Sequence, residues 1–154
     1  MKKERSLLLF VLLFLLTACS KYCRYGEDFN HTFMLDNFVF GGSFSTIEYY
    51  LATPPDVLLG LNKGYDFPCE VKEEISFLEY MTGIQAHKAY EITTVKISAA
   101  DSAYLVQDLE KWKNWYENNK SYLSLSKDYR MLRYKKDGIQ RSVDVMTHKC
   151  RDWF

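Results

Sequence analysis

The chain has 154 residues, of which 47% are hydrophobic, 26% are charged and 16% are aromatic. This length suits one compact domain and leaves little room for two. Basic and acidic residues number 20 each, so the charge balance argues against a general polyanion binder and gives no reason to propose nucleic acid as a partner. Only seven Gly and three Pro argue against a collagen-like, linker-like or disordered chain.

The first eighteen residues have the pattern of a targeting segment. Lys2, Lys3 and Arg5 form a basic start, and an apolar run of ten residues follows from Leu7 to Leu16. A membrane-spanning helix needs about twenty apolar residues. The run is therefore typical of a signal peptide rather than of a transmembrane helix.

The apolar run ends in Leu16-Thr17-Ala18-Cys19, and here the chain resembles the lipobox of bacterial lipoprotein precursors. The resemblance implies that the peptide before Cys19 is removed and that a lipid is attached to this cysteine. Ser20 stands where the family's inner-membrane retention signal is an aspartate, so the resemblance implies a place in the cell envelope at the outer rather than the inner membrane. An ordinary secretory signal cleaved nearby, or an uncleaved anchor, is the alternative.

The same resemblance implies the domain boundaries, and it implies that the membrane is a partner, bound through the lipid. Residues 1–18 are the signal peptide, residues 19–30 are the lipidated N-terminus and a tether, and residues 31–154 are one globular domain. Each buried methylene of an acyl chain contributes about 0.8 kcal/mol, so several chains on Cys19 would hold the domain at the membrane. This lipid is the only covalent group that we expect, and no cofactor is predicted.

Three cysteines remain besides the lipidated one, and in an oxidising envelope two of them are expected to form a disulfide. Cys69 with Cys150 is the preferred pair, because both adjoin predicted regular elements whereas Cys23 lies in the tether. The spacing leaves the other pairings open. No metal site is predicted, since the chain has no C-x-x-C and its histidines have no partner at helical ligand spacing. These histidines are His31, His87 and His148.

The first predicted elements of the domain are one strand and two short helices. Residues 31–40 are aromatic and partly alternate, which predicts a strand with a break at its centre. Ser45 and Glu48 have the spacing of a capping box, which predicts a short helix from there to about residue 51. Pro54 and Pro55 end that helix and open the next one.

A further helix and a second strand are predicted in the middle of the chain. Residues 70–82 predict a helix, with Gly83 placed to cap its end. One apolar stripe runs along it: Val71, Ile75, Leu78 and Met81. Residues 89–97 alternate and are rich in β-branched side chains, which predicts a strand.

The clearest predicted element is a helix over residues 98–119, with Ser98 as its N-cap. Its apolar stripe is expected to face the core: Leu105, Leu109, Trp112 and Tyr116. The chain then predicts a hairpin of residues 129–134 and 139–146 around a turn of residues 135–138, in which Asp137-Gly138 supplies the positive φ angles. The sequence therefore predicts a small single α+β domain with three to four helices and a C-terminal β-hairpin.

Two short segments of the sequence resemble parts of helical-repeat proteins. Two segments are similar in sequence to HEAT-like repeats and to parts of uncharacterised bacterial envelope proteins: FLEYMTG at Phe77–Gly83 and WKNWYENNK at Trp112–Lys120. No second copy is present and a predicted strand separates the helices, which argues against a solenoid. The resemblance implies only that these two helices pack together.

The motifs of known catalytic sites are missing from the sequence. There is no G-x-S-x-G and no phosphate-cradling loop. Cys150 and His148 would point the same way on a strand, but a disulfide-bonded cysteine is the simpler interpretation in an oxidising compartment. Neighbouring carboxylates such as Glu73 and Glu74 diverge on a helix, so they are poor candidates for paired glycosidase acids.

The aromatic residues carry the remaining functional signal, with 12 Tyr, 10 Phe and 3 Trp. Some are core, but Tyr and Trp also suit protein interfaces. Trp115 lies roughly 90 degrees from the centre of the buried stripe, so we expect it at the edge of its helix with Lys111 and Asn119 as a candidate binding surface.

The sequence favours binding over catalysis. We expect a lipid-anchored envelope protein that binds another envelope or secreted protein, as an assembly accessory or a toxin-immunity protein. An envelope hydrolase that acts on peptidoglycan or polysaccharide is the alternative.

Overall fold

The structure is a computed structural model that describes residues 31–61, 67–92 and 97–145. Residues 31–34 are helical and continue through a π-helical turn, η1 (Leu35–Val39), into α2 (Phe40–Ala52). The elements that follow are α3 (Pro55–Leu61), α4 (Phe67–Thr82), α5 (Ala99–Asn119), the 3-10 turn η2 (Lys120–Tyr122), β1 (Leu123–Leu125), β2 (Met131–Lys136) and β3 (Ile139–Asp144). The chain is thus a small α+β domain, as the sequence predicts.

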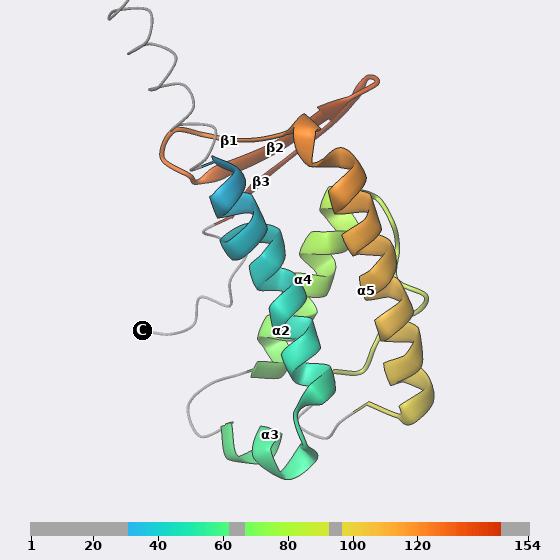
Figure 1. Ribbon diagram of the computed structural model, residues 1–154. Helices are drawn as coiled ribbons and strands as arrows, with labels where there is room; N and C mark the ends of the chain where they lie inside the picture. The colour runs from blue at the N-terminus through green and yellow to red at the C-terminus, as the bar shows by residue number, and fades with distance from the viewer. Residues whose placement is uncertain (1–30, 62–66, 93–96, 146–154) are drawn as a thin grey trace, which may run out of the picture.

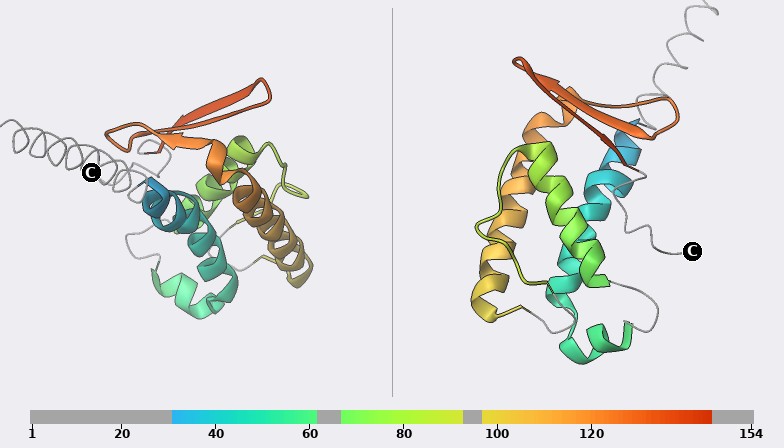
Figure 2. Two further views of the ribbon diagram at one scale, coloured as in Figure 1. Left: turned by 45° about the horizontal axis from the view of Figure 1, so that its top comes forward. Right: turned by 180° about the vertical axis from the view of Figure 1, so that it is seen from behind.

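Three helices form the body of the domain and an antiparallel sheet covers one end of it (Figure 1). Helices α2, α4 and α5 all contact one another, so α4 and α5 pack together as expected. The sheet has the order β1-β2-β3 and lies across the ends where α4 and α5 finish and where residues 31–39 lie (Figure 2). Two hydrogen bonds tie β3 to α4: Tyr80 Oη donates to the carbonyl of Ser142, and Arg141 donates to the carbonyl of Met81.

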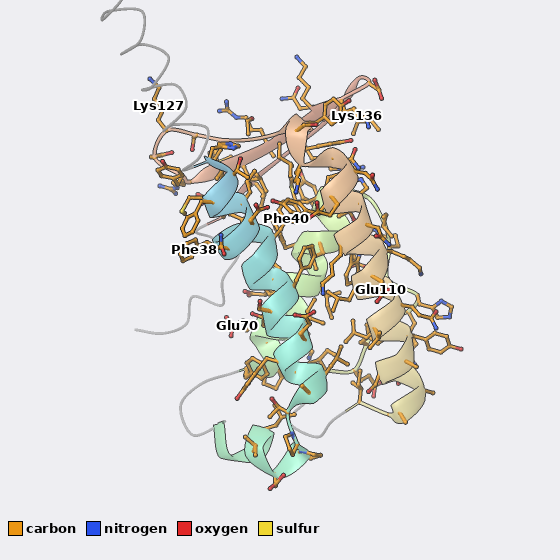
Figure 3. All side chains as sticks on the ribbon, viewed as in Figure 1. Phe38, Phe40, Glu70, Glu110, Lys127 and Lys136 are labelled. Carbon is orange, nitrogen blue, oxygen red and sulfur yellow. The ribbon has the colours of Figure 1, made fainter. Side chains whose placement is uncertain are left out.

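One apolar core lies among these three helices and under the sheet. The predicted stripe of α5 is buried, with Leu105 and Trp112 completely inaccessible to solvent. It meets buried side chains of α2, α4 and β2, among them Phe40, Ile47, Tyr50, Val71, Leu78, Met81 and Leu132. Figure 3 shows Phe40 pointing from the start of α2 into this space. The predicted stripe of α4 is buried as well.

The predicted strand over residues 31–40 is wrong, because the segment is helical. Its buried side chains, Leu35 and Phe40, are five residues apart, and the π-helical turn brings both onto the face that continues with Phe44 and Ile47. The capping box is also wrong, since Ser45 lies in the middle of α2 and is exposed. The helix has already begun before Ser45, so no orphan amide needs a cap there.

The other helices agree with the sequence. α3 begins at Pro55, α4 begins three residues before the predicted start, and Gly83 follows α4 with a φ of 71°. The side chain of Ser98 accepts a hydrogen bond from the amide of Asp101, as an N-cap should.

The hairpin is confirmed, with Lys135 and Lys136 in β2 rather than in the turn. The second predicted strand is not confirmed. Asp137 and Gly138 have φ angles of 50° and 79°, which are the positive values of a tight turn, and Lys136 pairs with Ile139 across it. Of the predicted strand 89–97, residues 89–92 and 97 are described and none is in a strand. Side chains hold this segment instead: Ile92 is buried and Tyr90 bonds to Asp108 on α5.

Candidate binding groove between α2 and α5

A glycine makes the irregular turn at the start of α2 possible. In the π-helical turn the amide of Phe40 donates to the carbonyl of Leu35, five residues earlier. A Cβ on Gly41 would lie 1.8 Å from the carbonyl oxygen of Asp36, which is closer than any two such atoms can approach. Gly41 therefore permits the turn, and such insertions are frequent at functional sites.

The turn directs the carboxylate of Asp36 towards α5. Tyr116 Oη donates to Asp36 Oδ1 at 2.5 Å, across 80 residues of sequence. Burial of the Tyr116 phenol, together with its bond to the carboxylate, raises the pKa of this tyrosine well above its usual value. Tyr116 therefore stays a proton donor and fixes the carboxylate in place.

A groove lies where Asp36 meets α5. Its cavity has a volume of about 370 Å³. It is lined by Asp36, Gly41, Phe44, Lys113, Tyr116, Glu117 and Lys120. The residues come from the π-helical turn, α2, α5 and the start of η2, so the groove follows the seam between two packed helices and has rigid walls.

Two lysines hold their ammonium groups over aromatic rings in this groove. Lys113 Nζ lies 5.9 Å from the centre of the Phe44 ring and pairs with Glu48. Lys120 Nζ lies 5.8 Å from the centre of the Tyr116 ring and pairs with Glu117 at 2.7 Å. The hydrogen bond from Lys120 to Glu117 raises the pKa of this lysine. Exposed ion pairs of this kind contribute about 0–1 kcal/mol, so they can exchange for charges on a partner at little cost.

The expected surface of Trp115, Lys111 and Asn119 is not one exposed patch. The Trp115 ring is half-buried, 5.0 Å from the ring of Tyr134 and 6.3 Å from that of Phe40. Asn119, which the sequence places at the edge, is buried. Its Oδ1 accepts hydrogen bonds from Tyr134 Oη and Lys136 Nζ. β2 crosses the end of α5 and covers both, which a helical projection of α5 alone cannot show.

Lys111 is exposed and pairs with Asp108 at 2.8 Å. Asp108 has no exposed side-chain surface, and it also accepts from the amide of His87 at 2.6 Å and from Tyr90 Oη at 2.7 Å. Burial acts to raise the pKa of Asp108, but the three hydrogen bonds outweigh it and hold the pKa below its usual range. This network fastens residues 87–90 to α5.

Glu73 and Glu74, the neighbouring carboxylates considered in the sequence, both lie on α4. Glu74 accepts from Ser43 Oγ, and one carboxylate oxygen of Glu73 is buried without a hydrogen bond. Of the described carboxyl groups, Asp101, Asp108 and Asp128 have a pKa below the usual range.

Several predicted site residues lie outside the described residues: Cys19, Cys23, Cys150 and His148. Cys69 is half-buried in the first turn of α4 and is disulfide-bonded. The other cysteines lie outside the described residues, so its pairing with Cys150 stays a prediction. His31 and His87 are described, and His31 Nε2 accepts from the amide of Leu125. Within the described ranges no three His, Cys, Asp or Glu side chains are grouped to hold a metal ion. Nor does any helix in that part of the chain combine the length and apolar character needed to cross a bilayer.

A second cavity, of about 490 Å³, lies between α4 and residues 85–92. Two of its charged groups are used by the fold, because Glu79 accepts from the amide of Ala86 and Lys88 pairs with Asp101. The groove between α2 and α5 is the stronger candidate, since an irregular turn and two lysines over aromatic rings converge there.

The π-helical turn can be tested with two neighbouring glycines. Gly41→Ala is expected to lower the free energy of unfolding by about 1–3 kcal/mol, the usual cost of an added methyl in a filled space. A Cβ on Gly42 would have no neighbouring atom within 4 Å, so Gly42→Ala is the matched control and is expected to stabilise the helix by about 0.5–1 kcal/mol. Urea unfolding of both variants gives the values. Equal effects of the two substitutions would contradict the turn.

Comparisons of the chain with protein-family models, with curated proteins and with solved structures found no match.

Proposed function

We propose that this chain is a lipid-anchored protein of the bacterial cell envelope that binds another protein through the groove between α2 and α5. The role is that of an assembly accessory or a toxin-immunity protein. The observation that carries the proposal is the pair of lysines held over aromatic rings beside the fixed carboxylate of Asp36. The envelope location rests on the lipobox-like residues that end in Cys19.

The groove has the properties of a protein-binding surface. The rings of Phe44 and Tyr116 are buried and form a floor under the two lysines, so the surface that a partner meets is the charged groups above them. The charges around them are of both signs, which favours specificity and fast association over affinity alone. The partner that fits is a protein segment that carries charges of both signs, because such a segment can exchange ion pairs with Lys113 and Lys120.

Photo-crosslinking in the native envelope tests this proposal. A benzoylphenylalanine at position 117, inside the groove, is expected to give one discrete protein adduct. The same probe at position 135 on β2, which is exposed and outside the groove, is the control. Lys113→Met together with Lys120→Met should reduce the adduct several-fold, whereas Lys135→Met should not.

Stability is a required control for these variants. The ion pairs removed are exposed, so the free energy of unfolding should change by no more than about 1 kcal/mol. The proposal fails if positions 117 and 135 give the same adducts, or if the double variant keeps the full yield.

A further inference from the structure

Two exposed phenylalanines lie at the π-helical turn, Phe33 just before it and Phe38 within it. Phe38 is 58% exposed and Phe33 is 47% exposed. Their rings form an edge-to-face pair with centres 5.8 Å apart. Neither ring belongs to the groove, since that cavity is lined from the same turn by Asp36. The turn therefore presents a carboxylate to α5 and an aromatic pair to another side.

A basic residue lies at the same end of the molecule. Figure 3 shows Phe38 on the outer side of its helix and Lys127 at the bend between β1 and β2, near the start of that helix. A hydrogen bond from the amide of Leu125 to His31 Nε2, 2.6 Å long, ties β1 to the start of the helix. The other charged side chains of the bend are paired, because Asp128 bonds to Ser126 within the bend and Arg130 bonds to Asp144 on β3.

The sequence places this end of the domain next to the proposed anchor. His31 is twelve positions after Cys19, and a fully extended chain of that length spans at most about 40 Å. The helix start can therefore lie no more than about 40 Å from the bilayer, whereas the far end of the bundle, which lies about the length of α5 (~30 Å) away, can be that much farther out. A surface tethered in this way needs only weak affinity to stay bound, because its local concentration at the bilayer is high.

We infer that Phe33, Phe38 and Lys127 form a membrane-contact surface that lies on the bilayer to which Cys19 is attached. The inference rests on the proposed lipid attachment. Aromatic side chains enter the boundary between headgroups and acyl chains, and a lysine beside them is attracted by anionic headgroups. Contact through this surface would fix the orientation of the domain, with the groove facing along the membrane rather than into it.

The test uses the full chain, processed in a bacterium and placed in vesicles of phosphatidylethanolamine and phosphatidylglycerol that contain an alkyne-bearing phospholipid. A benzoylphenylalanine replaces Phe38 in one variant and Tyr104 in another. Tyr104 is also an exposed aromatic, but it lies near the beginning of α5, at the opposite end of the bundle from the sheet. Position 38 is expected to give several-fold more lipid adduct than position 104, and Lys127→Glu should lower the yield at position 38.

Flotation of the same vesicles separates the two proposals. If the chain does not float with the vesicles, or if Cys19→Ala floats equally well, the proposed lipid attachment is wrong. The proposed contact surface, which depends on it, is then wrong as well. If the chain floats through Cys19 but positions 38 and 104 give equal lipid adducts, the attachment stands and the contact surface is wrong. Adducts that join position 38 to a second copy of the chain or to another protein, in place of lipid, would also contradict the proposed contact surface.

Discussion

Replacing Trp112 with alanine is expected to lower the free energy of unfolding by about 3–5 kcal/mol, the range measured for large aromatic residues in cores. The Trp112 side chain is completely buried, and its Nε1 donates to the carbonyl of Ile84 at 2.9 Å. The substitution removes the packing and leaves that carbonyl without its donor. Domains are stable by only about 5–15 kcal/mol in total, so the variant should unfold at a clearly lower urea concentration.

Two further variants separate the contributions of this tryptophan. Trp112→Phe keeps most of the ring but loses the hydrogen bond, and it should cost about 1–3 kcal/mol. Trp115→Ala is the matched control on the same helix, because that ring is half-buried and packs against Phe40 and Tyr134. It should cost less than Trp112→Ala. An equal or larger cost at Trp115 would show that the core is not centred on Trp112.

The parts of the fold that the sequence predicts correctly are those with local signals. The helix over residues 98–119 has a cap at its start and an apolar stripe along its length, and both are confirmed. The hairpin turn at Asp137-Gly138 needs positive φ angles, which these residue types tolerate. In each case residues a few positions apart determine the structure, so the pattern is visible without the rest of the chain.

The prediction for the segment 31–40 is wrong because its structure depends on distant residues. Its aromatic residues alternate as in a strand, yet Asp36 bonds to Tyr116 and Phe40 stacks on the Tyr116 ring at 4.5 Å. The π-helical turn adds one residue and shifts the buried face, so no single period describes the segment. Gly41 is the one residue type in this segment that indicates an irregular turn. Its role still depends on the position of the Asp36 carbonyl, five residues before it.

The groove cannot be predicted from the sequence for a similar reason. In the sequence Lys113 and Lys120 are visible only as charges on or beside a helix, and the rings of Phe44 and Tyr116 under them come from two different elements. Asp108 is also hard to recognise. It is three residues after Leu105 and four before Trp112, which places it on the buried face, but an acidic residue at such a position is usually exposed.

Replacing Asp108 with alanine is the second substitution with a large expected effect. The amide of His87 and the hydroxyl of Tyr90 both lose their acceptor. A buried donor left without a partner costs about 1–3 kcal/mol, so we expect a loss of about 3 kcal/mol in the free energy of unfolding. Lys111→Met is the control, because the lysine is half exposed and its removal should cost no more than about 1 kcal/mol.

The same carboxylate should make the domain sensitive to acid. An aspartate in the unfolded chain titrates near pH 3.9, whereas the hydrogen bonds to Asp108 hold its folded pKa below the usual range. The ionised form therefore stabilises the fold above about pH 4, and this contribution is lost as the pH falls through the lower folded pKa. Asp108→Asn removes it, so urea unfolding at a series of acidic pH values should show a shallower loss of stability in the variant. Asp101 and Asp128, whose pKa values are also lowered, are present in both proteins and cancel in the comparison. If the two proteins lose stability equally below about pH 4, Asp108 is not the ionised centre of this network.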